Sequence, residues 1–254
     1  MNSKAKTYIA GAAAVGLTLL AIGLFQVGFP NPTRLAMFLL LALLASTLKV
    51  HLPGITGTMS VSFLFILMGI ADYTFSETIL AGCAGALVQS LWKARRRPQP
   101  VQILFNVSAL AISISVSYWG SHVVLERAGT SSLVVLLALA ACLFFVTNTG
   151  LVATVLSLVE QKPLRNVWRQ CYAWSFPYYL VGAAIAAVVS LVSRSAGWRV
   201  SLLVLPVMYL TYVWYRWFLE TAAHQQSQLT PAYCGIGLGA SSSEDKETVG
   251  RAAD

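Results

Sequence analysis

The sequence predicts an all-α fold, a polytopic transmembrane helical bundle with about eight spans. Of the 254 residues, 57% are hydrophobic and 10% are charged, and the mean hydropathy is +0.71. Soluble domains carry about 25% charged residues, and a soluble chain of this size leaves much of its surface in water. Here the apolar residues form long runs, and the cations stand at the ends of those runs. Together these observations predict that lipid surrounds most of the chain.

The apolar segments are unequal in length. A spanning helix needs roughly 20 apolar residues, which the first, fifth, sixth, seventh and eighth segments reach. The second segment is short for a span, because only residues 35–48 separate Arg34 from Lys49. A span is still possible, because both side chains can extend to the interface. The third and fourth share a short connection, and we expect either two full spans or a short helical pair buried against the other helices. The segments are 7–29, 34–50, 58–76, 78–92, 101–124, 132–159, 174–193 and 199–219.

The placement of lysine and arginine predicts the orientation, because cytoplasmic connections are enriched in these residues. With a cytoplasmic N-terminus and eight crossings, the basic connections at 93–97 and 162–169 lie in the cytoplasm. Both termini are then cytoplasmic in a multi-pass membrane protein. A seven-span arrangement would move one end to the other side. The cations expected on the non-cytoplasmic side are Arg34, Arg127, Arg194 and Arg199.

The composition divides the chain into a large membrane domain and a short tail. Residues 1–219 contain all the apolar segments and are predicted to form the transmembrane helical domain. Residues 220–254 are polar and rich in serine, glycine and acidic side chains. Because such a segment lacks the apolar residues that form a core, we expect a disordered cytoplasmic tail.

The sequence contains no catalytic constellation. The histidines His51, His122 and His224 stand far apart, and none of the acidic residues lies in the middle of a predicted span. A membrane enzyme usually holds ionisable groups inside its bundle, where they are costly. We therefore expect no enzyme activity, no cofactor and no metal site. A net charge of +8 would suggest nucleic acid in a soluble protein, but these cations mark span ends, and no nucleic-acid partner is expected.

Uncharged polar residues within the apolar segments are the candidates for a ligand site. A buried amide in lipid must find a partner, so Asn106 and Asn148 either line a polar pocket or join helices by hydrogen bonds. The loop at 52–57, LPGITG, interrupts the helical pattern, and Thr58 or Ser60 can cap the next helix. Such a helix start can bind an anion, or the loop is a simple connection. The candidate ligand-binding residues are Asn106, Asn148, Thr58, Ser60, Ser108 and Thr147.

Two basic connections are candidate contact sites for lipid or for another protein. LWKARRRPQPVQ and EQKPLRNVWRQCYAW each follow an apolar segment. They serve either as orientation signals and turns, or as contacts for anionic lipid or a cytoplasmic partner. The second contains tryptophan and is predicted to lie along the interface as an amphipathic stretch. The residues expected at these contacts are Lys93, Arg95, Arg96, Arg97, Lys162, Arg165 and Arg169.

Several motifs in a fixed order resemble a known membrane module. They are HLPGITGTMSVSF at 51–63, a basic hairpin ahead of an FN span containing Asn106, and VTNTG at 146–150. Over most of residues 35–219 the chain is similar to the N-terminal multi-span region of bacterial HD-GYP and GGDEF signalling proteins. In those proteins this region precedes a cytoplasmic phosphodiesterase or cyclase domain as its sensory input.

The resemblance implies a sensory or regulatory module, multi-pass in the bacterial plasma (inner) membrane. No HD, GYP or GGDEF motif follows in this sequence, so we expect a stand-alone module that acts through a cytoplasmic signalling partner. A vaguer similarity to the substrate-binding subunits of energy-coupling-factor vitamin transporters implies an alternative. Those subunits use spans rich in small residues and a polar loop to bind a ligand, so the chain would be a small-molecule-binding or transporter component. The lipid bilayer is a partner in both cases.

Overall fold

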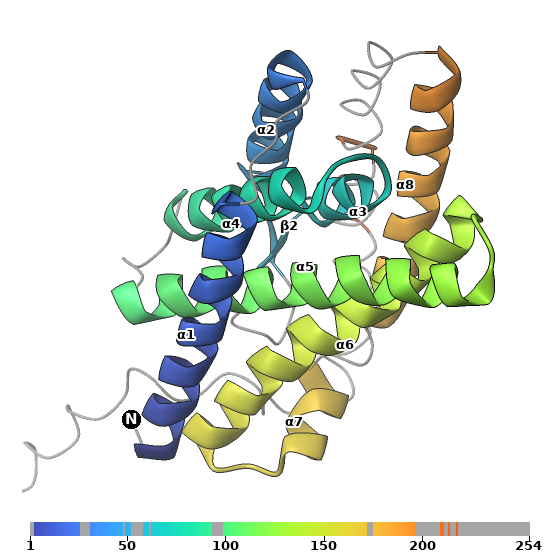
Figure 1. The fold of residues 1–254 in the computed structure, drawn as a ribbon. Helices are drawn as coiled ribbons and strands as arrows, with labels where there is room; N and C mark the ends of the chain where they lie inside the picture. The colour runs from blue at the N-terminus through green and yellow to red at the C-terminus, as the bar shows by residue number, and fades with distance from the viewer. Residues whose placement is uncertain are drawn as a thin grey trace, which may run out of the picture.

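The structure is a computed structural model that describes most of the predicted membrane domain. The described residues are 3–25, 31–47, 49–51, 58–60, 62–92, 99–171, 175–196, 209, 210, 213 and 217. Within them the chain forms helices α1 to α8 and one short pair of strands (Figure 1). The tail at 220–254 and most of the eighth predicted segment lie outside the described residues. The prediction of a helical fold is confirmed, with the strand pair as an exception.

Helix α1 (Ser3–Phe25) packs against α5 through small side chains. Its buried face consists largely of alanine and glycine, including Ala12, Ala13 and Gly16. A Cβ atom on Gly16 would lie 2.5 Å from the backbone of Ser108 in α5. Small residues of this kind let two helix backbones approach closely, which is the usual way that helices associate in lipid.

Helix α2 (Pro32–Thr47) leads into the strand pair. Strands β1 (Lys49–His51) and β2 (Thr58–Ser60) are antiparallel, with Val50 opposite Met59. The expectation that Thr58 or Ser60 caps the next helix is therefore wrong, because both lie in β2 and α3 begins at Ser62. Proline and glycine in the intervening sequence interrupt helices, and the flanking residues pair as strands instead.

Helices α3 (Ser62–Asp72) and α4 (Phe75–Leu91) form a short pair inside the bundle. The 11 residues of α3 rise about 16 Å at 1.5 Å per residue, roughly half the hydrocarbon thickness of a bilayer. Eight consecutive residues of α3, 63–70, are buried, because α2, α4, α6 and α8 all pack against it. Of the two arrangements expected for these segments, the structure has the short buried pair.

Helices α5 (Pro100–Ala128) and α6 (Leu133–Glu160) are the longest and cross each other along the lower half of the bundle (Figure 1). Helix α5 begins with Pro100, whose missing N–H is not needed at this position. It ends at Gly129, which adopts the left-handed conformation with φ of 61°. Most of the buried serines of α5 donate to the carbonyl four residues earlier, as Ser113 does to Ala109 at 2.8 Å. This satisfies their hydroxyl groups without a partner helix.

Helix α7 (Leu164–Cys171) is short and amphipathic, as predicted for this connection. Val167 is buried against Ala153 of α6, while Arg165 and Arg169 are exposed. The Trp168 indole donates to the Thr149 hydroxyl at 3.0 Å, which fixes α7 to α6. Helix α8 (Phe176–Ala196) then returns along α3 and α6 to the opposite end of the bundle.

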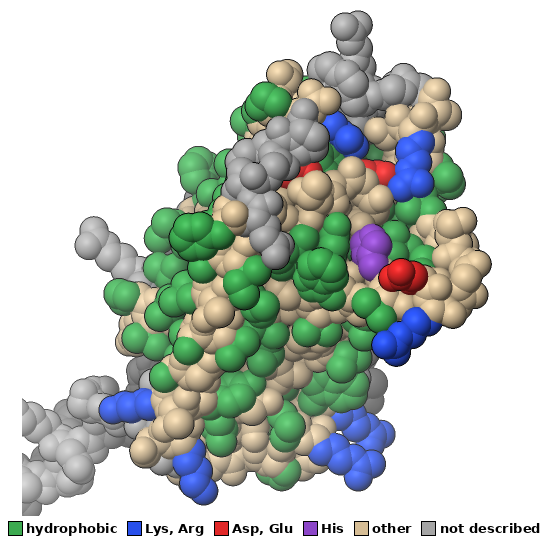
Figure 2. Space-filling view, in the orientation of Figure 1, with side chains coloured by type: hydrophobic (Ala, Val, Ile, Leu, Met, Phe, Trp, Pro, Cys, Tyr) green, Lys and Arg blue, Asp and Glu red, His purple; other side chains and the backbone are tan. Residues whose placement is uncertain are grey.

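The outer surface of the bundle is apolar over much of its area. Figure 2 shows hydrophobic side chains across the middle of the visible face, with basic side chains towards its ends. Large aliphatic side chains face outwards in the middle of helices, including Val146 at 58% and Val188 at 61% exposure. Among the described helices α1, α5, α6 and α8 are long and apolar enough to cross a membrane. Lipid is the solvent that such a surface requires.

Candidate functional site

The strongest polar feature in the described part of the chain is an ion pair between α3 and α8. The Asp72 carboxylate accepts hydrogen bonds from Arg194, at 2.8 Å from Nε and 2.7 Å from a terminal guanidinium nitrogen. The same guanidinium donates to the Ala71 carbonyl at 3.0 Å. The Asp72 side chain is only 11% exposed, whereas that of Arg194 is 53% exposed. The pair is therefore screened less than a surface ion pair and more than a fully buried one.

A second arginine reaches the same helix end from α2. Arg34 donates to the Asp72 backbone carbonyl at 3.2 Å, and its guanidinium lies 4.4 Å from the centre of the Tyr73 ring. The last four carbonyls of a helix have no partner within the helix, and two of those of α3 are satisfied here by arginines from two other helices. Burial raises the pKa of the Tyr73 phenol, and the charge of Arg34 offsets part of this rise.

The turn from α3 to α4 is held by a capping box. Thr74 precedes α4, and its hydroxyl accepts from the Glu77 N–H at 3.3 Å while the Glu77 carboxylate accepts from the Thr74 N–H at 2.9 Å. Tyr118 of α5 donates to the Tyr73 carbonyl at 3.4 Å. These contacts fix the position of Asp72 relative to α4 and α5. We call Arg34, Asp72, Tyr73 and Arg194 the ionic junction.

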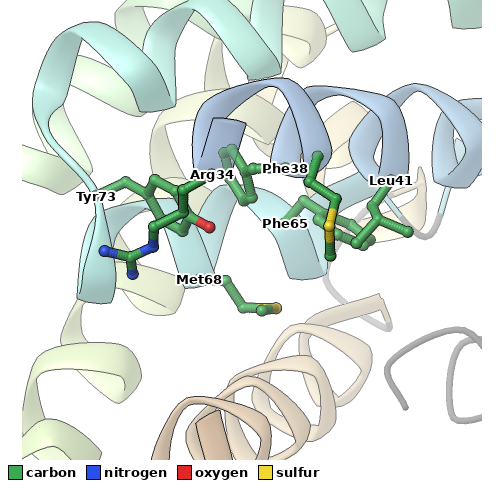
Figure 3. A pocket seen from close by; sticks show the side chains of 7 residues that line it. Arg34, Phe38, Leu41, Phe65, Met68 and Tyr73 are labelled. Carbon is green, nitrogen blue, oxygen red and sulfur yellow. The ribbon is translucent and has the colours of Figure 1, made fainter. Parts of the chain in front are cut away.

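A small hollow lies beside the junction, between α2 and α3. Figure 3 shows the Arg34 guanidinium and the Tyr73 ring together at one end of it, with Leu41 towards the other end. Its apolar lining includes Phe38, Phe65 and Met68. The enclosed part has room for about one water molecule. An organic ligand would therefore enter only if α2 and α3 moved apart.

The arrangement couples four helices at one end of the bundle. Asp72 of α3 binds Arg34 of α2 through its backbone carbonyl and Arg194 of α8 through its carboxylate. Tyr118 of α5 donates to the carbonyl of the next residue, Tyr73. Loss of the Asp72 charge would leave the Arg194 guanidinium without its carboxylate. An ion pair between two helices is the kind of contact that conformational switches make and break.

The structure separates the residues that the sequence suggested for a polar pocket. The Asn106 side chain is exposed on α5, and Thr147 and Asn148 of α6 are half-buried. Ser108 is fully buried against Gly16, and its hydroxyl has no hydrogen-bond partner among the described atoms. None of these residues lines the hollow beside the junction. Thr58 and Ser60 are placed in β2 by their backbone only.

The two basic connections differ in what the structure describes. Lys93, Arg95, Arg96 and Arg97 lie outside the described residues. Lys162, Arg165 and Arg169 are exposed at the end of the bundle where α6 meets α7. Lys162 forms an ion pair with Glu160 at 2.8 Å.

The ionic junction was not among the sequence predictions. In the sequence Arg34 and Arg194 indicate only the orientation of the segments, and residue 72 lies near the short connection between the third and fourth segments. The signal in the sequence that could have indicated the junction is the scarcity of acidic residues near the apolar segments. Asp72 stands at a segment end with cations at two other segment ends predicted on the same side, and an isolated acid near lipid usually has a partner.

Comparison with known families agrees with this architecture. The profile of MASE9, a membrane-associated sensory family, matches residues 16–218. The matched region covers most of the chain and contains the whole ionic junction. No curated protein and no solved structure has significant similarity to the chain. A match of this extent, on a bundle of apolar helices, establishes that the chain belongs to the MASE9 family of membrane-associated sensory domains.

Proposed function

We propose that the chain is a multi-pass sensory module of a bacterial inner membrane and that it regulates a cytoplasmic signalling partner. The observation that carries the proposal is the MASE9 match across residues 16–218. The described residues of this chain contain no catalytic constellation. A sensory module of this kind is expected to act on its partner by changing shape. The apolar outer surface of the helices supports a position within the bilayer.

In this proposal the ionic junction is the element that changes between two states. It lies at the end of the bundle that the distribution of cations predicts to face away from the cytoplasm. Helix α8 runs from this end back to α7, so opening of the Asp72–Arg194 pair frees one end of α8. A shift of α8 relative to α3 and α6 would then reach the cytoplasmic end, because packed helices move as rigid elements.

The partner in this proposal contacts the basic connection at 93–97. The cations of the 93–97 connection provide a surface for an acidic protein face. The resemblance to the input regions of HD-GYP and GGDEF proteins supports a partner that makes or degrades a cyclic dinucleotide. Binding of the partner is expected to depend on the charge of the 93–97 connection and on the state of the ionic junction.

The test is co-purification from native membranes under gentle extraction, followed by assay of the recovered material for cyclase and phosphodiesterase activity. Wild-type protein is expected to recover such an activity, and a variant with Arg95, Arg96 and Arg97 changed to glutamine is expected to recover much less. Arg127→Gln is the control, since it removes an exposed cation at the end of α5 that belongs to no basic connection. The proposal fails if no signalling activity accompanies the wild-type protein, or if both variants recover it equally.

The contribution of the junction is tested in the same preparation. Asp72→Asn removes the carboxylate charge and is expected to change the specific activity of the recovered partner without removing the basic connection. If the activity recovered with Asp72→Asn equals that of the wild type, the junction is not the switching element.

A further inference from the structure

The end of the bundle opposite the ionic junction is built around the short helix α7. The turn that precedes α7 places Gln161 in the left-handed conformation with φ of 56°. The Ser157 hydroxyl donates to the Lys162 carbonyl at 2.6 Å, which holds the turn against α6. Val167 is buried and Trp168 is bonded to Thr149. Helix α7 is therefore anchored along its apolar side and presents its opposite side outwards.

The outward side of α7 is basic. Arg165 and Arg169 are four residues apart, so they lie on one face of the helix, and both are exposed. No acidic side chain of the described residues lies within ion-pair distance of either arginine. Their charges are thus available to an anion from outside the described chain.

Two further exposed cations lie at the same end. Lys4 and Lys6 stand near the start of α1, and the neighbouring Tyr8 and Ile9 pack with residues 151–155 of α6. Figure 2 shows basic side chains at the lower end of the view, where α1 begins and α7 lies in Figure 1. Among the four acids in the described part of the chain, only Glu160 belongs to this end, and it is paired with Lys162. We call Lys4, Lys6, Arg165 and Arg169 the basic rim.

We propose that the basic rim binds the phosphate headgroups of anionic phospholipids, with α7 lying in the headgroup layer as an interfacial helix. The rim surrounds the ends of α1 and α6, two helices long and apolar enough to span, so the headgroup layer meets the protein at this level. Arginine binds phosphate through two parallel hydrogen bonds. An anionic leaflet attracts such cations, and each cation near the surface adds to the attraction.

Three features favour lipid over a protein partner at this surface. The apolar side of α7 is already occupied by α6, so the exposed side offers charge without an apolar centre, whereas protein interfaces usually have one. The Leu164 side chain is 45% exposed beside the arginines, which suits the acyl boundary next to the headgroups. The indole of Trp168 lies at the same level, where tryptophan is enriched in membrane proteins. This proposal rests on the membrane environment and does not depend on the sensory role.

The test is native mass spectrometry of the full-length protein in detergent, titrated with phosphatidylglycerol or with phosphatidylcholine. The wild-type protein is expected to bind the anionic lipid more tightly. Arg165→Gln with Arg169→Gln is expected to reduce this preference by roughly fivefold for each arginine removed. Arg165→Lys with Arg169→Lys keeps the charges and is expected to retain most of the preference.

Arg127→Gln is the matched control, because Arg127 is an exposed cation at the end of α5, beside the start of α6, whereas α7 follows the other end of α6. It is expected to leave the lipid preference unchanged. The thermal midpoint measured in phosphatidylcholine alone reports folding, and if the double glutamine variant unfolds, the two single glutamine variants replace it. The proposal is overturned if the wild type shows no preference, if the glutamine variants keep it, or if Arg127→Gln lowers it equally.

Discussion

Gly16 shows how one residue sets the distance between two helices. The backbone of Ser108 occupies the place where a larger side chain would start, since a Cβ on Gly16 would be 2.5 Å from it. Backbone atoms cannot turn aside as the end of a long side chain can. The separation of α1 and α5 therefore depends on the absence of a side chain at this position.

Gly16→Ala is expected to lower the free energy of unfolding by about 1–3 kcal/mol, the usual cost of overpacking a tight contact. Unfolding is measured by denaturant titration in mixed micelles. Gly11→Ala is the control on the same helix, because no atom lies within 4 Å of a Cβ placed there. That variant should be neutral or more stable, since alanine favours helix more than glycine does. Equal destabilisation by both would show that helix propensity, not contact, controls this segment.

Asp72 provides the only carboxylate of the ionic junction. Asp72→Asn keeps the size of the side chain and removes its charge, so Arg194 loses its counter-ion. We expect a loss of about 1–2 kcal/mol in the free energy of unfolding, between the values typical of exposed and buried ion pairs. Arg194→Lys should cost less than removal of the charge, because a lysine retains the attraction but not the forked donor geometry.

Glu126→Gln serves as the control for Asp72→Asn, since Glu126 is an exposed acid at the end of α5. Its substitution should change stability by less than about 0.5 kcal/mol, as for most surface positions. If both substitutions have the same small effect, the pair seen between α3 and α8 contributes nothing to stability.

At the scale of elements, the position of α7 depends on a hydrogen bond from Trp168, on the burial of Val167 and on the turn that Ser157 holds against α6. The bond joins the Trp168 indole and the Thr149 hydroxyl, which also donates to the Phe145 carbonyl. A double-mutant cycle with Trp168→Phe and Thr149→Val isolates this interaction. The expected coupling is about 0.5–1.5 kcal/mol, as for other hydrogen bonds of this kind, measured as the free energy of unfolding. A coupling of zero would mean that this hydrogen bond does not help to hold α7 on α6.

The long helices were predictable from the sequence because one physical rule determines them. A run of apolar residues bounded by polar ones forms a helix in lipid, where the backbone must satisfy its own hydrogen bonds. The predicted segments 101–124 and 132–159 correspond closely to α5 and α6. The amphipathic character of the connection at 162–171 could also be predicted, because the cations Arg165 and Arg169 flank the apolar Val167 and Trp168.

The short elements and the junction could not be predicted in the same way. Composition makes residues 58–76 look like one long apolar segment, yet strand pairing at 58–60 shortens the helix to 62–72. The pair of Asp72 and Arg194 joins positions 122 residues apart, and nothing local in the sequence specifies such a contact. At Asn106 the sequence predicts a site that the structure does not have. An amide within an apolar run suggested a buried pocket, but the rotation of α5 places its side chain outwards.

The distribution of charge over the whole molecule determines how it inserts into a membrane. The basic rim lies at one end of the bundle, and the ionic junction, in which a carboxylate accompanies two arginines, lies at the other. Because lysine and arginine are retained on the cytoplasmic side, the basic rim is expected in the cytoplasm. The turn between α5 and α6 is then on the opposite side, and α7 is on the cytoplasmic side.

Labelling of single cysteines in intact cells tests this orientation. Thr130→Cys lies in the α5–α6 turn and Asn166→Cys lies on α7, and both positions are exposed. In a background with the four native cysteines changed to serine, a membrane-impermeant maleimide should react with Thr130→Cys directly. It should react with Asn166→Cys only after the membrane is permeabilised. The reverse pattern would place the ionic junction in the cytoplasm, and both the proposed direction of signalling and the assignment of the basic rim to the cytoplasmic leaflet would then be wrong.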